Sequence, residues 1–227
     1  MIPLDRLVIV MLGAHDVELG MTGTLIVNVA IFALLITGLW RFERRLESGQ
    51  ILVGLALIAV IGITGRIILE PLPNISPVTI LLLLAGAHYG MRHGLLLATV
   101  IVVCSNLVLG HGIWTLYQIV AWSLVACAGA YLSTWLIDSD GKLNINRLIV
   151  VGFASGFAFD WFVSLSVLHT QPISYLAPYL VQGFVYDLVH AIGNLAFAAW
   201  LGVPISDMLK RHYSFKLEAT NNVPHAF

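Results

Sequence analysis

The chain has 227 residues, of which 59% are hydrophobic and only 10% are charged, and its mean hydropathy is +0.93. A soluble domain carries about 25% charged residues, so this composition excludes an ordinary soluble domain. The formal net charge of −1 gives no indication of a nucleic-acid partner. Because the apolar runs are continuous rather than alternating, the sequence predicts an all-α integral membrane protein embedded in a lipid bilayer.

Seven apolar runs, two of them short, are candidates for the roughly 20-residue helix that crosses a bilayer. The first is expected at about Thr22–Trp40, after a mixed surface segment and before a charged hairpin at Arg41–Gln50. The other six are expected at about Ile51–Leu69, Val78–Gly90, Gly94–Leu109, Trp114–Ile137, Arg147–Leu168 and Tyr179–Val203. We therefore divide the chain into an N-terminal segment (1–50), a six-helix core (51–203) and a cytoplasmic tail (204–227).

The distribution of lysine and arginine predicts the orientation in the membrane, because cytoplasmic loops carry an excess of both. If the Arg41–Gln50 hairpin lies in the cytoplasm, every other lysine and arginine of the chain lies there too, except Arg6 and Arg66. The residues that join the hairpin there are Arg92, Lys142, Arg147, Lys210, Arg211 and Lys216. The expected protein lies in the plasma membrane with its N-terminus outside and its C-terminus in the cytoplasm. The segments Glu70–Ser76, Gly110–Gly112 and His169–Ala177 then share the outer face.

Aromatic and amide side chains cluster around the turn Gly110–Gly112. The candidate ligand-binding residues here are Asn106, His111, Trp114, Tyr117, Gln118 and Trp122. The last four fall on one face of the following helix at 100° per residue. An interfacial aromatic belt is the alternative interpretation. Gln118 on that face and the depth of Trp122, two turns into the helix, favour a pocket.

A polar stripe runs along one side of the last expected span. It consists of Tyr179, Gln182, Tyr186, Asp187, His190 and Asn194. Polar groups inside a membrane are costly and face either the bundle interior or a wet cavity. The stripe therefore predicts either hydrogen bonds between helices or a cavity wall, and we take all but Asn194 as candidate binding residues.

Three ionisable residues are expected in the outer halves of the spans: Arg66, Asp160 and Asp187. Counted from the helix ends, both carboxylates lie at a depth of roughly 12–14 Å. Two unpaired carboxylates at that depth would be expensive, so at least one is expected to pair with Arg66 or to line water. A purely structural ion pair remains the alternative to a role in binding.

Two motifs that would indicate catalysis are missing from the sequence. It contains neither H-E-x-x-H nor a Walker A sequence, so it predicts no metal site of that kind and no ATP hydrolysis by this chain. We expect no catalytic residue, no bound metal and no resident cofactor.

Two stretches carry a resemblance to a known family. They are P-N-I-S-P-V-T-I-L-L-L-L-A-G-A-H-Y-G from Pro73 to Gly90, and S-N-L-V-L-G-H-G-I-W-T-L-Y-Q-I-V-A-W from Ser105 to Trp122. The chain resembles the substrate-binding (S) components of energy-coupling factor (ECF) transporters, and most of all those of the cobalamin type. In that group the stretches read approximately P-N-x-x-P-V-T and S-N-F-x-x-G-Q-G-P-W-T-P-W-Q-M-x-A-W. His111, Leu116 and Tyr117 depart from the usual Gln, Pro and Trp.

The resemblance implies a six-helix S component over Ile51–Val203, with Thr22–Trp40 as an additional N-terminal helix. It implies that a vitamin, cobalamin in the first place, binds near the outer face. The implied partners are a transmembrane scaffold subunit and two ATPase subunits, which alone use ATP. Family members contact the scaffold through small residues on the first core helix, where this chain has Ala56, Ala59 and Gly62.

Two other classes of function stay open on the sequence. One is a stand-alone secondary transporter driven by protons through Asp160, Asp187 and His190. The other is an intramembrane enzyme that uses His190 and Asp187 as an acid–base pair. Uptake by an S component requires its ATPase partners, whereas uptake by a secondary transporter does not. Product formation by the purified chain alone would identify an enzyme.

Overall fold

The computed structural model describes residues 49–221 except residue 111, together with residues 22, 23, 26, 29, 30, 33 and 37. The expected helix at Thr22–Trp40 and the hairpin after it therefore lie largely outside the described residues. The candidate ligand residue His111 lies outside them as well.

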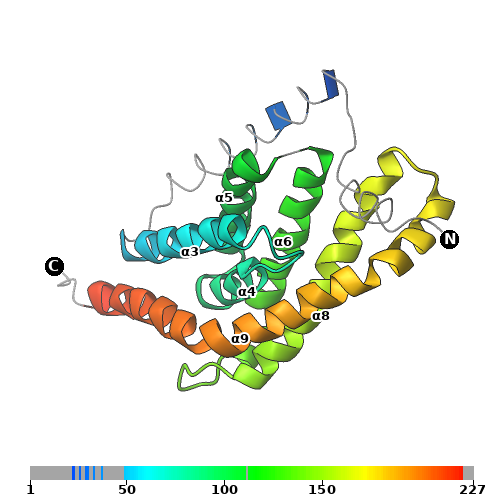
Figure 1. The fold of residues 1–227 in the computed structure, drawn as a ribbon. Coiled ribbons are helices and arrows are strands. Elements are labelled where there is room, and N and C mark those ends of the chain that lie inside the picture. Colours follow the sequence, from blue (N-terminus) through cyan, green and yellow to red (C-terminus); the bar gives the residue numbers. More distant parts are fainter. Residues whose placement is uncertain are drawn as a thin grey trace.

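From residue 49 onward the described chain is helical and contains no β-strand (Figure 1). Its α-helices are α3 (Gly49–Ile68), α4 (Val78–Tyr89), α5 (Met91–Leu109), α6 (Ile113–Tyr131), α7 (Ser133–Leu136), α8 (Ile145–Ser164) and α9 (Leu176–Asn221). Two 3₁₀ turns, η2 (Leu165–His169) and η3 (Ile173–Tyr175), connect α8 to α9. Every span expected after residue 50 has a corresponding helix, and the expected starts lie within a few residues of the observed ones.

Five of these helices are long and apolar enough to cross a membrane, and α4, with 12 residues, is shorter. Side chains with large exposed apolar surface lie on several of them, including Leu107, Val181 and Trp200. In water such surface would be unfavourable, whereas lipid chains cover it without cost. The chain is therefore an all-α membrane-embedded protein.

Local sequence explains how the helices end. Gly90 and Gly110, which terminate α4 and α5, have φ values of 82° and 93°. Only glycine adopts these angles without strain, and the chain reverses sharply at both points. At the start of α8 the Asn144 side chain accepts a hydrogen bond from the Arg147 backbone N–H at 3.3 Å, which satisfies a free donor of the first turn.

Helix α4 lies at the centre of the bundle, where every residue from Ile80 to Ala85 has no solvent exposure. It packs closely against α6, because a Cβ atom on Gly86 would overlap the Ala126 carbonyl oxygen and one on Gly129 would overlap that of Leu83. Small residues at a helix crossing let two backbones approach in this way.

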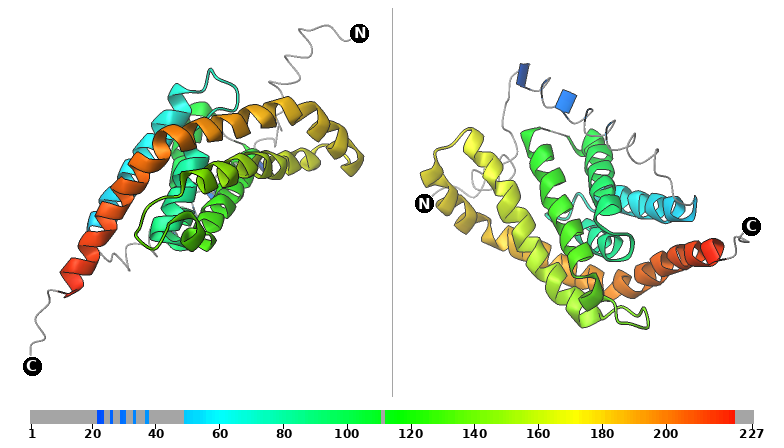
Figure 2. Two further views of the ribbon diagram at one scale, coloured as in Figure 1. Left: turned by 90° about the horizontal axis from the view of Figure 1, so that it is seen from below. Right: turned by 180° about the vertical axis from the view of Figure 1, so that it is seen from behind.

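Helix α9 runs along the whole length of the molecule, from the hairpin with α8 to the C-terminal end (Figures 1 and 2). It contains Pro204 and continues to Asn221, so the expected tail is helical at least that far. The last turns of α3, α5 and α8 and the first turns of α6 border one cavity, together with the part of α9 that carries Tyr186 and His190. We call this region the cavity end.

Candidate functional site

A cavity of about 230 Å³ opens at the cavity end. Its walls come from α3 and the loop after it, α5, α6, α8 and α9. Eight of the candidate residues line it: Arg66, Asn106, Trp114, Gln118, Trp122, Asp160, Tyr186 and His190. Residues from four separate stretches of the sequence thus meet at one hollow, as the cost of polar groups in a membrane predicts.

On one wall of the cavity, Arg66 is held by neutral groups. Its Nη1 atom donates to Ser105 Oγ at 2.7 Å and to Asn106 Oδ1 at 2.9 Å. Its Cζ atom lies 4.8 Å from the centroid of the Trp122 ring, within the range of a cation–π contact. Neither Asp160 nor Asp187 pairs with Arg66, so the ion pair considered from the sequence does not form.

Asn106 links this wall to the start of α6. Its Nδ2 atom donates to Thr115 Oγ1 at 3.0 Å and to Gln118 Oε1 at 2.8 Å. Thr115 Oγ1 also accepts the Gly112 backbone N–H at 3.3 Å, which closes the first turn of α6. The polar residues of the second sequence motif therefore fix the helix–turn–helix junction and the position of Arg66 together.

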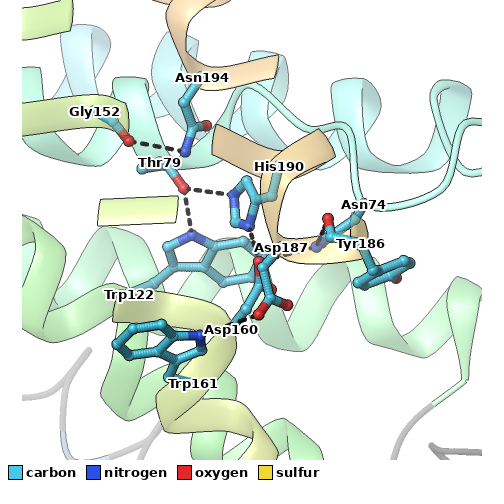
Figure 3. A network of polar contacts seen from close by, with 10 residues as sticks. All are labelled: Asn74, Thr79, Trp122, Gly152, Asp160, Trp161, Tyr186, Asp187, His190 and Asn194. Atoms are coloured by element: carbon cyan, nitrogen blue, oxygen red, sulfur yellow. Dashed lines mark hydrogen bonds and ion pairs between the residues drawn. The ribbon is translucent and has the colours of Figure 1, made fainter. Parts of the chain in front are cut away.

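A second wall, which meets the first at Trp122, is built on a buried polar chain (Figure 3). His190 Nδ1 lies 2.9 Å from Asp160 Oδ2, and His190 Nε2 lies 3.2 Å from Thr79 Oγ1. Trp122 Nε1 donates to the same Thr79 oxygen at 3.1 Å, and the Trp122 ring stacks on Phe159 with centroids 4.2 Å apart. The chain joins α4, α6, α8 and α9 at the base of the cavity.

Asn74 joins the loop after α3 to this wall. Its Nδ2 atom donates to Asp160 Oδ2 at 3.0 Å and to the Tyr186 carbonyl oxygen at 3.1 Å. Its φ of 57° lies in the left-handed region, which asparagine tolerates better than most residues. The loop is thereby held across the cavity, with Asn74, Ile75 and Ser76 in its lining.

Four candidate residues lie away from the cavity lining. Tyr117 contacts His169 Nε2 at 3.0 Å through its hydroxyl and packs against Phe162. Tyr179 and the exposed Gln182 lie nearer the start of α9 than Tyr186. Asp187 is buried, and its Oδ2 atom accepts a hydrogen bond from Trp161 Nε1 at 3.1 Å. The partner of His190 is therefore Asp160, which corrects the pairing with Asp187 considered for an enzyme.

The three residues considered for a scaffold contact have different surroundings. Ala56 is exposed and Ala59 is partly exposed. Gly62 is buried against α5, where an added Cβ atom would lie 2.7 Å from Ile101 Cδ1. Gly62 therefore serves contact between helices within the chain.

Sequence reasoning missed several residues of the site. The further cavity-lining residues are Leu69, Glu70, Leu72, Asn74, Ile75, Ser76, Leu109, Gly110, Phe159 and Val163. Ser105, Thr115 and Thr79 lie behind the lining and orient it. Most of the polar ones belong to the two motif stretches, so the motifs themselves were the available signal.

We expect Asn106→Ala to lower the free energy of unfolding by about 1–3 kcal/mol, because it leaves a donor of Arg66 and an acceptor of Gln118 without partners in a buried setting. Thermal unfolding in detergent measures the loss. The matched control is Asn146→Ala, at an exposed position. Equal stability of the two variants would contradict the role assigned to Asn106.

The fold and the cavity together define a class: an all-α membrane protein with a small cavity, lined by both polar and apolar side chains, at one end of its bundle. Comparisons of the chain with protein-family models, with curated proteins and with solved structures find no match. The function is therefore argued from the site and from the two motif stretches that meet there.

Proposed function

We propose that this protein is the membrane-embedded substrate-binding subunit of a multisubunit vitamin importer of the ECF type, with cobalamin as the first candidate substrate. One observation carries the proposal. The two stretches that resemble S components, Pro73–Gly90 and Ser105–Trp122, meet at the same cavity, to which they contribute Asn74, Asn106 and Gln118 among others. A scaffold built only for stability has no need of a polar hollow at this point.

The character of the lining supports binding rather than chemistry. Asp160, His190 and Thr79 are connected in the order of an acid–base relay, but Thr79 is 0% exposed and its oxygen accepts the Trp122 N–H. No substrate atom reaches the Thr79 hydroxyl in this arrangement. We assign the relay a structural role and propose that the chain binds its substrate unchanged.

The size of the cavity bears on the choice of vitamin. Pockets for small molecules measure about 300–1,000 Å³, so the 230 Å³ observed lies below that range. A corrinoid is much larger, and its binding requires the walls to move apart. The mouth segments suited to such movement are the loop with the exposed residues Glu70, Pro71 and Leu72, and the turn at Gly110. A small vitamin needs less opening.

The proposed partners are a transmembrane scaffold subunit and two ATPase subunits, which supply the energy. On α3 the exposed side chains of Ala56, Leu57 and Val60 form a face available to a scaffold helix. Gly62 is excluded from this face because α5 covers it. We propose the plasma membrane as the location, with the cavity end facing outward.

Titration of the purified full chain against cobalamin, riboflavin, thiamine, biotin and folate tests the proposal. We expect submicromolar binding of one vitamin. In proteoliposomes, uptake of that vitamin is expected only when the scaffold and active ATPases are present. Uptake by the chain alone under a proton gradient would instead establish a secondary transporter, and conversion of the vitamin would establish an enzyme.

A further inference from the structure

Arg66 is a cationic side chain in the cavity wall, and no described residue pairs with it through a carboxylate. In the part of the chain that the structure describes, Lys142 pairs with Asp140 at 2.8 Å, Arg147 with Asp138 at 3.4 Å and His190 with Asp160 at 2.9 Å. Among the described residues, Arg66 has only the neutral acceptors Ser105 Oγ and Asn106 Oδ1 and the face of Trp122.

Most of the donors of Arg66 remain unused. Both of its hydrogen bonds come from Nη1, whereas a guanidinium carries five N–H donors. No described residue accepts a hydrogen bond from its Nη2 or Nε atoms. A guanidinium held on one side in this way presents the rest of its planar fork, which matches the oxygens of a carboxylate or phosphate.

Gln118 adds a further donor to the same wall. Asn106 Oδ1 accepts from Arg66, so Asn106 Nδ2 is the donor toward Gln118 and the Gln118 oxygen is the acceptor. The Gln118 amide N–H₂ group is then left without a partner among the described residues. Arg66 and Gln118 together make this wall rich in donors and poor in free acceptors.

The two carboxylates that line the cavity, Asp160 and Glu70, do not form an ion pair with Arg66. Asp160 instead accepts from His190 and from Asn74. Glu70 is exposed in the mouth, and within the described chain it forms no ion pair with Arg66. An unpaired charge at a membrane cavity is costly, and that cost is recovered when a ligand brings the opposite charge.

We propose that the ligand of this cavity carries an oxyanion, either a carboxylate or a phosphate, which binds Arg66 with a further hydrogen bond from Gln118. This inference rests on the proposed function in so far as the ligand is a vitamin, and it adds the chemical feature by which that vitamin is selected and oriented. The ionic group lies against Arg66, and the rest of the ligand extends toward Tyr186 and the mouth.

The test uses ligand pairs of which one member lacks the anion, bound to the purified full chain. Nicotinate against nicotinamide and biotin against its amide probe a carboxylate. Pyridoxal 5′-phosphate against pyridoxal probes a phosphate. Cobalamin against cobinamide probes a phosphodiester; cobinamide keeps the corrin ring but also lacks the ribose and the benzimidazole, so for this pair the Arg66 variants decide whether the anion is responsible. We expect the bound pair to favour its anionic member by roughly 10- to 150-fold, the range expected for a hydrogen-bonded charge.

Variants assign the preference to Arg66. Arg66→Gln is expected to abolish the preference, and Arg66→Lys to retain part of it because the charge remains without the fork. Ser105→Ala keeps the charge and removes one of the hydrogen bonds that orient it, so a smaller loss is expected. The matched control is Arg147→Gln, which lies outside the cavity lining and should leave the preference unchanged. A thermal unfolding curve accompanies each variant.

The outcomes separate this inference from the proposed function. A vitamin that binds equally well without its anion, or a preference that survives in Arg66→Gln, overturns the inference and leaves the importer proposal standing. If no vitamin binds, the importer proposal falls, and titration with inorganic phosphate and acetate decides the inference. Binding of either anion that is lost in Arg66→Gln upholds the inference, and no binding overturns it.

Discussion

Replacing Gly129 with alanine is expected to lower the free energy of unfolding by about 1–3 kcal/mol or to prevent folding, although it adds a single methyl group. The new Cβ atom would overlap the Leu83 carbonyl oxygen on α4. Helix α4 cannot retreat, because its residues Ile80–Ala85 are packed on all sides. The same argument applies to Gly86, whose Cβ atom would overlap the Ala126 carbonyl oxygen.

Thermal unfolding in detergent, read together with the monodisperse fraction in size-exclusion chromatography, measures this effect. Gly183→Ala is the matched control, because a Cβ atom there would meet only Asp187 Oδ1, at 3.8 Å. Alanine is the better helix former by about 1 kcal/mol, so the control should be neutral or more stable. If Gly129→Ala proved as stable as Gly183→Ala, the close packing of α4 against α6 would be disproved.

Replacing Asp160 with alanine is expected to lower the free energy of unfolding by about 3–5 kcal/mol, the range for breaking a buried pair from one side. His190 would lose the partner of Nδ1, and Asn74 would lose one of its two acceptors. Both lost interactions join separate elements, so the loop after α3 and helix α9 should loosen together. Ligand binding is expected to weaken with them, since this pair forms one wall of the cavity.

Asp160→Asn tests the origin of that loss. Asparagine keeps an oxygen that accepts from one of the two donors but removes the charge. The free energy of unfolding is therefore expected to fall by less than in Asp160→Ala. Asp140→Ala removes an exposed pair with Lys142 and should leave the melting temperature unchanged. Equal melting temperatures for Asp160→Ala and Asp140→Ala would refute the structural importance of the Asp160–His190 pair.

The spans could be located from the sequence because the bilayer sets a length that an apolar helix must reach. Each run expected after residue 50 corresponds to a helix, including the short one at Val78–Tyr89. The end of the last helix was placed at Val203, yet α9 continues to Asn221. Composition changes gradually there, and a helix does not end merely because it leaves an apolar environment.

The existence of one polar hollow could be anticipated for a similar reason. Polar side chains inside a membrane are costly unless they face the bundle interior or a wet cavity. We therefore expected the polar residues of the outer halves of the helices to lie close together, among them Arg66, Asn106, Gln118, Asp160 and His190. Eight candidate residues do line one cavity. What the sequence determined by itself was therefore the membrane class, the positions of the helices after residue 50 and the group of polar residues that gather at one cavity.

The pairing of those groups was decided only by the tertiary structure. Asp160 and Asp187 have similar depths, but the packing of α8 against α9 brings Asp160 to His190 and turns Asp187 toward Trp161. Helical spacing gives the relative angle of residues within a helix, whereas the rotation and tilt of each helix follow from its neighbours. Among the described residues, the same packing leaves Arg66 without a carboxylate partner, which could not be read from the sequence pattern.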